Sequence, residues 1–165
     1  MRFIRLITAC LVMPSGFPIS AIEKHDFSGE DIEYYVLRPI NDHKNTFYVP
    51  TSNSTLVNKM RPVFSHEEAE KLIKVMPDEN SIWIDDEAAR KEAYSRIIDS
   101  GDRLELVKLI KTLYIHKQKL AEQHKQLHSN DERFLNNAEN MLFDELAYAL
   151  GISREEVIPY IEAHI

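Results

Sequence analysis

A helix stop followed at once by a helix start constrains the fold of this chain more than any other feature. Gly101 suits the left-handed backbone that commonly follows a helix. Asp102 can accept hydrogen bonds from the first free amides of the next helix, and Glu105 completes a capping-box-like pair. The spacing predicts a helix over residues 102–125 with one apolar stripe. The stripe comprises Leu106, Val107, Leu109, Ile110, Leu113 and Tyr114.

Basic residues lie outside that stripe on the same predicted helix. Lys108, Lys111 and Lys119 fall on the opposite side, and residues 103–125 hold six Lys/Arg against two acids. Two interpretations remain open for this face. It is either a solvated surface or a contact surface for a negatively charged partner.

Charge is distributed unevenly between the two parts of the chain. Residues 1–64 hold seven Lys/Arg and six Asp/Glu, a net charge of +1, whereas residues 65–165 hold thirteen and twenty-one, a net charge of -8. A nucleic-acid-binding protein that acts alone is usually basic. Any DNA contact is therefore expected to be local, weak and assisted by a larger partner.

The first part of the chain alternates short strand-forming runs with turns. Residues 33–38 and 46–50 are rich in strand formers, and residues 61–64 give a last short strand. This pattern predicts a small antiparallel barrel or a strongly bent sheet. Residues 1–21 place two arginines ahead of an apolar run that contains Cys10, so a signal peptide and a buried first strand remain alternatives there.

From Ser65 onward the apolar period becomes helical. Capping boxes are expected at Ser65 and Ser129, because each is followed three residues later by glutamate, and Ser153 is expected to start the last short helix. The predicted fold class is therefore α+β. A small antiparallel β domain over residues 1–64 is followed by an all-α domain of about five helices over residues 65–165.

The sequence carries no catalytic signature. Its four glycines are widely spread and form no phosphate-binding loop, and the single cysteine excludes an internal disulfide. His124 and His128 are four residues apart, but histidine near a helix end is favourable without a metal. We expect no enzyme activity, cofactor, metal or small-molecule substrate. No apolar run reaches the length of a membrane span.

Trp83 is the only tryptophan and lies in a linker ahead of a predicted helix. It either fills a seam between the two domains or forms an exposed wedge against a partner or a DNA base step. Arg90 and Lys91 on the following helix are candidates for phosphate contact. They are equally suited to pair with neighbouring carboxylates.

An ordered set of short motifs runs across residues 19–162. The set consists of EYYVLRP at 33–39, VP at 49–50, MRPV at 60–63, SGD at 100–102 and ELAYALGIS at 145–153, with WI at 83–84 ahead of SGD. In this order the motifs resemble the CarD family of bacterial transcription regulators, in particular its clostridial-type branch.

This resemblance implies a Tudor-like, SH3-like β domain that binds the β subunit of RNA polymerase, a fold shared with the polymerase-interacting domain of the transcription-repair coupling factor. It also implies a helical domain that contacts promoter DNA at the upstream edge of the melting bubble. A tryptophan wedge in the minor groove there helps to keep the open complex from closing. The family is cytoplasmic and uses neither catalysis nor a cofactor.

Carried over by position, the resemblance assigns polymerase contact to Arg38, Val49 and Pro50. It also assigns His25 and Tyr48, which stand where the family often has arginines. These two residues allow polar contacts but not the bidentate charged contacts of arginine. The stretch from residue 11 to residue 19 lacks the glycine pattern with which the family opens.

For DNA contact the resemblance and the charge pattern assign Trp83, Arg90, Lys91, Lys108 and Lys111. The family's tryptophan lies about four residues later, at a position where this chain has glutamate, and two aspartates that repel phosphate follow Trp83 closely. An alternative function is therefore a protein-interaction module that binds polymerase or another protein without DNA contact. The net charge of the helical part favours that alternative.

Overall fold

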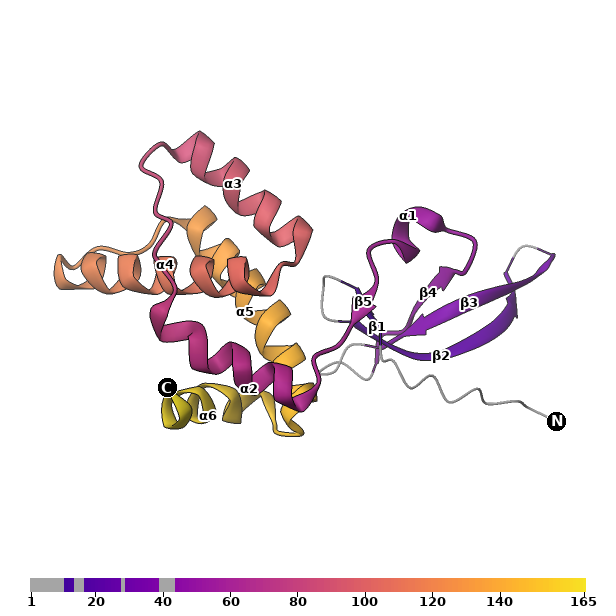
Figure 1. The fold of residues 1–165 in the computed structure, drawn as a ribbon. Coiled ribbons are helices and arrows are strands. Elements are labelled where there is room, and N and C mark those ends of the chain that lie inside the picture. Colours follow the sequence, from indigo (N-terminus) through magenta and orange to yellow (C-terminus); the bar gives the residue numbers. More distant parts are fainter. Residues whose placement is uncertain (1–10, 14–16, 28, 39–43) are drawn as a thin grey trace. The chain divides into compact units, whose positions relative to one another are not determined.

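The computed structural model describes residues 11–13, 17–27, 29–38 and 44–165 (Figure 1). Cys10 and most of the candidate signal peptide lie outside the described residues. The chain divides into two compact units, Met1–Val63 and Phe64–Ile165, here called the β unit and the helical unit.

The β unit contains a five-stranded antiparallel sheet with the strand order β4-β3-β2-β1-β5. Its strands are β1 (Leu11–Met13), β2 (Phe17–Asp26), β3 (Asp31–Leu37), β4 (Phe47–Pro50) and β5 (Arg61–Pro62), with a short helix α1 (Ser54–Val57) between β4 and β5. The long strand β2 has an irregular register between Ile19 and Ala21, where it pairs with β3. Such an irregularity increases the local bend of a sheet.

The turn that joins β2 to β3 follows from local sequence. Gly29 has a φ of +88°, a conformation that glycine adopts without steric cost. Its N–H donates to Oδ1 of Asp26 at 2.5 Å. Beyond the turn, Val36 and Leu37 of β3 and Val49 of β4 are buried and form the apolar contacts of the sheet.

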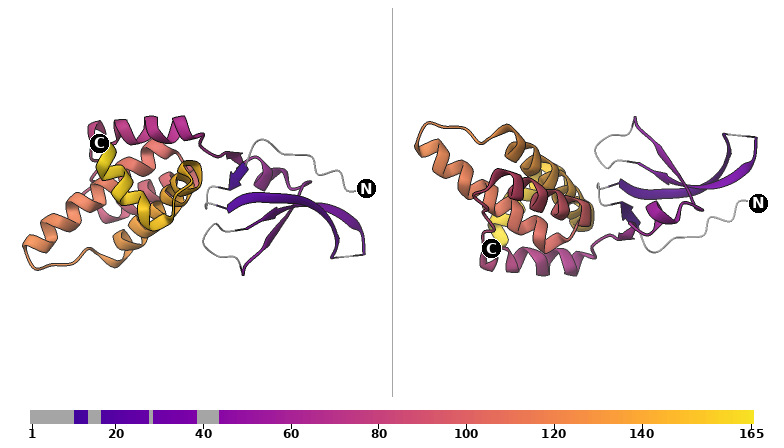
Figure 2. Two further views of the ribbon diagram at one scale, coloured as in Figure 1. Left: turned by 90° about the horizontal axis from the view of Figure 1, so that it is seen from below. Right: turned by 90° about the horizontal axis from the view of Figure 1, so that it is seen from above.

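The helical unit, all of whose residues the structure describes, contains five α-helices. They are α2 (His66–Val75), α3 (Glu87–Ser100), α4 (Arg103–Glu122), α5 (Ser129–Leu150) and α6 (Val157–His164), with 3₁₀ turns η1 (Met76–Asp78) and η2 (Arg154–Glu156). Antiparallel strands followed by helices confirm the predicted α+β class. Figures 1 and 2 show α4 and α5 packed side by side through the middle of this unit.

The core of the helical unit forms where α4 and α5 meet. Leu106, Leu109 and Leu113 of α4 and Leu142 and Leu146 of α5 are each no more than 1% exposed. Each such leucine stabilises the fold by about 1.5–3 kcal/mol through burial. The predicted apolar stripe of α4 is confirmed at its three leucines and at Val107 and Ile110, all of which are buried. Tyr114, which was predicted to share it, is 42% exposed because it lies at the edge of the stripe.

The capping box predicted at Ser65 is confirmed. The Ser65 hydroxyl accepts from the Glu68 N–H at 3.2 Å, and the Ser65 N–H donates to the Glu68 carboxylate at 2.8 Å. These bonds lower the pKa of Glu68. Ser153, where only a helix start was predicted, forms the same arrangement with Glu156.

The capping box predicted at Ser129 is wrong. Helix α5 already includes Ser129, and its N-cap residue is His128, which makes no side-chain capping bond. The glutamate that would have closed the box, Glu132, instead lies 3.3 Å from the Lys117 ammonium of α4. An ion pair between helices has therefore replaced the local cap.

None of the helices in the described part of the chain combines the length and apolarity needed to cross a membrane. Within the same residues, no group of three or more His, Cys, Asp or Glu side chains is placed to hold a metal ion.

Candidate functional site

Four aromatic rings form a cluster on the sheet of the β unit. His25 stacks on Phe27 with ring centroids 5.1 Å apart and planes 7° apart, and its edge meets Tyr48 at 4.8 Å. Phe27 also lies 5.2 Å from Tyr34 and 5.3 Å from Tyr48. These four residues are called the aromatic cluster below.

The sheet register explains why three of these residues meet. Tyr34 of β3 pairs with Glu23 of β2, and Tyr48 of β4 pairs with Val36 of β3. Because side chains two residues apart share a face, His25, Tyr34 and Tyr48 project from the same side of the sheet. Phe27 joins them from the end of β2.

The cluster is partly open to solvent. Phe27 is 61% exposed and Tyr48 is 39% exposed, whereas Tyr34 is buried beneath them at 8%. The Nε2 atom of His25 lies 2.9 Å from the Glu23 carboxylate. A surface of this kind offers aromatic area and a small number of polar atoms, which is the composition enriched at the centres of protein interfaces.

The structure brings together only some of the predicted polymerase contacts. His25 and Tyr48 meet within the aromatic cluster, and Pro50 pairs with Tyr34 on the same side of the sheet. Val49 points to the other side and is 7% exposed, so it contributes to packing. Arg38 is exposed just beyond the end of β3.

Trp83 packs within the helical unit. The imidazole of His116 on α4 lies over its indole, with centroids 3.6 Å apart and planes at 18°. The guanidinium carbon of Arg90 on α3 lies 4.5 Å from the centre of the indole ring. The indole N–H donates to Oδ1 of Asp85 at 2.9 Å, and the ring is partly buried against the helical core.

Arg90 lies inside the helical unit, at 7% exposure. Its Nε and one terminal nitrogen donate to the two carboxylate oxygens of Asp131 on α5, at 3.1 and 3.2 Å. The other terminal nitrogen donates to the carbonyl oxygens of Ile84 and Asp85 at 2.8 and 3.2 Å. The bond to Asp131 raises the pKa of Arg90. Arg90 therefore ties α3, α5 and the Trp83 linker together.

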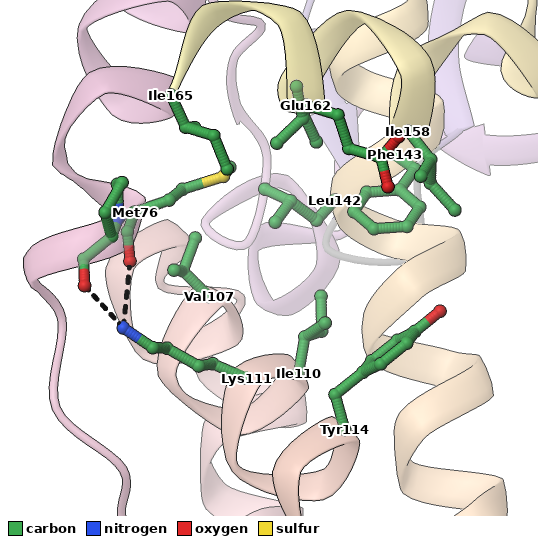
Figure 3. A pocket seen from close by; sticks show the side chains of 12 residues that line it. Met76, Val107, Ile110, Lys111, Tyr114, Leu142, Phe143, Ile158, Glu162 and Ile165 are labelled. Carbon is green, nitrogen blue, oxygen red and sulfur yellow. Dashed lines mark hydrogen bonds between the residues drawn. The ribbon is translucent and has the colours of Figure 1, made fainter. Parts of the chain in front are cut away.

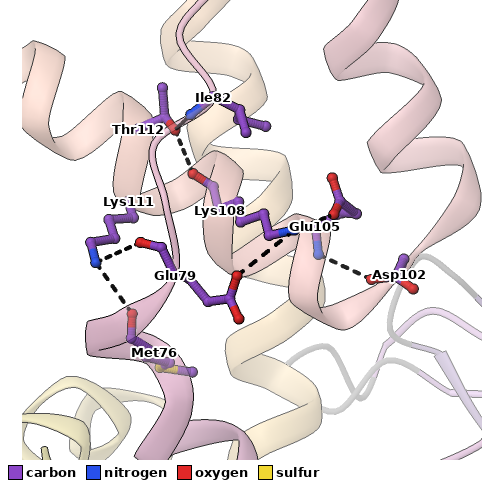
Figure 4. A network of polar contacts seen from close by, with 8 residues as sticks. All are labelled: Met76, Glu79, Ile82, Asp102, Glu105, Lys108, Lys111 and Thr112. Carbon is purple, nitrogen blue, oxygen red and sulfur yellow. Dashed lines mark hydrogen bonds and ion pairs between the residues drawn. The ribbon is translucent and has the colours of Figure 1, made fainter.

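Lys108 and Lys111 are half-buried and both face the segment that joins α2 to α3 (Figure 4). The ammonium of Lys108 lies 2.7 Å from the Glu105 carboxylate and 3.7 Å from that of Glu79. The ammonium of Lys111 donates to the carbonyl oxygens of Pro77 and Glu79 at 2.6 and 2.8 Å. Both lysines thus stabilise the segment that follows α2. Because their ammonium groups bind other residues of the chain, these two lysines do not form a simply solvated face.

Lys91 lies on the outer side of α3, where it and Arg133 of α5 line a hollow of about 210 Å³. The other lining residues are Ser95, Asn130, Phe134 and Asn137. Both cations are exposed, and neither forms an ion pair with a carboxylate among the described residues. Two free cations beside a hydroxyl and two amides suit an anionic group. This feature is called the basic hollow below.

A larger hollow of about 400 Å³ opens between η1, α4, α5 and α6 (Figure 3). Its lining is mainly aliphatic and aromatic, and includes Val107, Ile110, Leu142 and Ile158. Lys111 stands at its edge with its ammonium turned toward backbone carbonyl groups. The hollow therefore presents mainly apolar surface, with the Glu162 carboxylate of α6 also in its lining.

The family comparison bears on this helical unit. The model of the CarD C-terminal domain matches residues 71–162, more than half of the chain. The chain belongs to the CarD family. The match begins within α2 and ends within α6, so it includes the Trp83 stack and the basic hollow. No curated protein matches the chain. CarD membership makes this a transcription-associated protein.

Several residues of these sites were not predicted from the sequence. Neither Phe27 nor Arg133 was among the predicted site residues. The metal pair considered was His124 and His128, and His116 and Asp131 were not among the candidate site residues. Each gains its present role from a contact with a distant element, which helical or strand periodicity does not encode.

Proposed function

We propose that this CarD-family protein is a non-enzymatic, cytoplasmic transcription regulator of the clostridial-type branch. In this proposal the β unit binds the β subunit of RNA polymerase, and the helical unit modulates the stability of the promoter open complex. The observation that carries it is the aromatic cluster. It joins His25 and Tyr48, the two positions at which the family often has polymerase-contacting arginines.

The chemistry of the cluster defines the polymerase contact that we propose. Phe27 and Tyr48 supply exposed ring surface, and the hydroxyl of Tyr48 and the imidazole of His25 supply hydrogen-bonding atoms. No guanidinium is present at either position, so ring packing replaces bidentate ion pairs. We therefore expect the affinity for the β subunit to depend only weakly on salt.

A binding assay tests this contact directly. The full-length protein is titrated with the isolated β-subunit lobe of RNA polymerase. The combined change His25→Ala plus Tyr48→Ala should weaken binding by about 2 kcal/mol or more, as expected for aromatic residues near the centre of an interface. Ile22→Ala is the matched control, because Ile22 is 44% exposed and projects from the other side of the same sheet. Equal affinity of the double variant and the wild type would contradict the proposal.

For DNA we propose that the basic hollow contacts the phosphate backbone. Lys91 and Arg133 are cations on neighbouring helices that no described carboxylate neutralises. Arg90 lies behind this surface as a residue that positions α3, since Asp131 and two carbonyl groups occupy its guanidinium. The contact is small, which fits a protein that reaches DNA while held by polymerase.

A second candidate function, polymerase binding without DNA contact, is favoured by the charged residues of the helical unit. Arg90, Lys108 and Lys111 all have partners within the unit. The net charge of -8 over residues 65–165 also repels DNA.

The two candidates differ in their response to charge reversal. Lys91→Glu plus Arg133→Glu should reduce the effect on promoter opening and lower its salt dependence, if the basic hollow contacts phosphates. Lys71→Glu plus Lys74→Glu on α2 makes the same change in net charge at exposed positions and serves as the control. Identical promoter activity of the two double variants and the wild type would support the module without DNA contact.

A further inference from the structure

Trp83 is held by three different segments of the helical unit. His116 of α4 covers its ring at 3.6 Å, Arg90 of α3 lies 4.5 Å from the ring centre, and Asp85 accepts its indole N–H. The linker itself is fixed to α4, because the Ile82 N–H donates to the Thr112 hydroxyl at 2.8 Å. The stack formed by Trp83 and His116 is called the closed stack below.

We infer that His116 is a positioning residue that keeps Trp83 closed against α4, so that the indole can contact a partner only after the closed stack opens. We propose the open promoter as the target of the freed indole, and this part of the inference rests on the proposed function. The stack itself is a property of the free protein. An indole that stacks on a base step needs the ring face that His116 covers, so the two contacts exclude each other.

Of the two groups over the indole, His116 is the one able to move. The guanidinium of Arg90 is fixed by the Asp131 carboxylate and by two carbonyl oxygens. His116 forms no hydrogen bond or ion pair with any residue that the structure describes. Its side chain is held by ring contact alone, which rotation about its side-chain bonds can break without leaving a buried charge unpaired.

The surroundings of His116 make the closed stack sensitive to pH. Arg90 of α3, Lys119 of α4, Asp131 of α5 and Asp85 of the linker are the charged groups around it. Burial, and then the two cations, lower the pKa of His116 below its ordinary value of 6.5, against the opposing effect of the two aspartates. Neutral imidazole is therefore the form that the closed stack favours.

The direction of the pH effect follows from this lowered pKa. When the stack opens, His116 enters water and regains its ordinary pKa, so the open form binds a proton more readily. The closed stack is fully favoured above about pH 6.5 and is progressively lost below it.

The single tryptophan allows a direct test on the full-length protein, because all indole fluorescence comes from Trp83. Acrylamide quenching of this fluorescence measures how accessible the ring is. In the wild type, we expect the quenching constant to rise about twofold between roughly pH 7.5 and pH 5.5 as the stack opens. His116→Ala should give the high value at both pH values.

Two matched variants distinguish the stack from a general loosening of the fold. His116→Phe keeps an aromatic ring over Trp83 but cannot be protonated, so its quenching constant should stay low at both pH values. His164→Ala removes a different stacked histidine, which lies 4.0 Å from Tyr160, and should behave as the wild type. A pH response that persists in His116→Phe, or wild-type quenching equal to that of His116→Ala near neutral pH, would overturn the inference.

The quenching measurement tests the closed stack independently of the proposed function. If Trp83 acts on the open promoter, His116→Ala should also lengthen the lifetime of the open complex relative to the wild type. An unchanged lifetime in a variant with raised quenching would contradict the proposed role of Trp83 at the promoter and leave the closed stack established.

Discussion

Arg90 and Asp131 form a buried ion pair at the centre of the helical unit. They are 7% and 5% exposed, and the pair connects α3 to α5 across 41 positions of sequence. A buried charge that loses its partner is costly, whereas an exposed ion pair contributes little.

We predict that Asp131→Ala lowers the free energy of unfolding by about 3–5 kcal/mol, because it leaves the Arg90 guanidinium uncompensated. Urea unfolding measures the loss. Glu92→Ala is the control: it removes the exposed partner of Arg96 and should change stability by about 0–1 kcal/mol. A similar small change for both variants would show that the buried pair does not hold α3 and α5 together.

The burial of Tyr94 should make the free energy of unfolding depend on pH in the alkaline range. It is fully buried, and its hydroxyl has no hydrogen-bond partner among the described residues. Burial raises the pKa of Tyr94 from 10.0 to about 12, with a further increase from Asp131 and an opposing effect of Arg90. The folded state thus favours the neutral phenol.

The raised pKa of Tyr94 determines how the stability of the fold changes with pH. The contribution of neutral Tyr94 is complete below pH 10.0, the value of the unfolded chain, and is lost as the pH rises toward about 12. We predict that Tyr94→Phe abolishes this part of the alkaline loss in urea unfolding, with little change at neutral pH. Tyr148→Phe, at an exposed position, is the control and should retain the wild-type alkaline profile.

At the scale of elements, a hydroxyl of α4 binds the linker between α2 and α3 close to Trp83, in addition to the contacts that Lys108 and Lys111 make with the start of the linker. The Thr112 side chain is 1% exposed, accepts from the Ile82 N–H at 2.8 Å and donates to the Lys108 carbonyl at 2.6 Å. This bond fixes the linker one residue ahead of Trp83.

We predict that Thr112→Val, which keeps the shape but removes the hydroxyl, lowers the free energy of unfolding by about 1–3 kcal/mol by leaving the Ile82 amide unsatisfied. Thermal unfolding and Trp83 quenching are measured on the same sample, and quenching should increase. Thr112→Ser retains the hydroxyl and should restore low quenching. Low quenching in Thr112→Val would mean that the linker is held without this bond.

The elements themselves were largely predictable because their signals are local. Gly101 has a φ of +61°, and Asp102 accepts from the Glu105 N–H at 3.0 Å, as the sequence indicates. The burial of Leu106 and Leu109 follows equally from periodicity. A local pattern does not show which side chains meet between different elements. Lys111 is an example: the sequence predicted a DNA contact, but in the structure its ammonium donates to a carbonyl group just after α2.

The candidate sites, unlike the helices and strands, could not be predicted from local sequence. The aromatic cluster depends on the register of three strands, and the closed stack joins residues 83 and 116 of different segments. Family resemblance supplied His25 and Tyr48 as positions, but the ring contacts with Phe27 and Tyr34 required the structure.

At the scale of the whole molecule, two units of different charge carry two different tasks in the proposed function. In that proposal the near-neutral β unit would present aromatic surface to a protein partner, and the acidic helical unit would offer DNA one small basic hollow. A contact of two cations is too weak to recruit the protein to DNA on its own at physiological salt. Binding to polymerase would raise the local concentration of the helical unit at the promoter.

The measurement that tests this account most directly is the lifetime of the promoter open complex formed by RNA polymerase, with and without the full-length protein. We predict that the protein changes this lifetime, and that the combined change His25→Ala plus Tyr48→Ala abolishes the effect while Ile22→Ala retains it. A lifetime that the folded wild-type protein leaves unaltered, or an effect that survives loss of the aromatic cluster, would contradict the account.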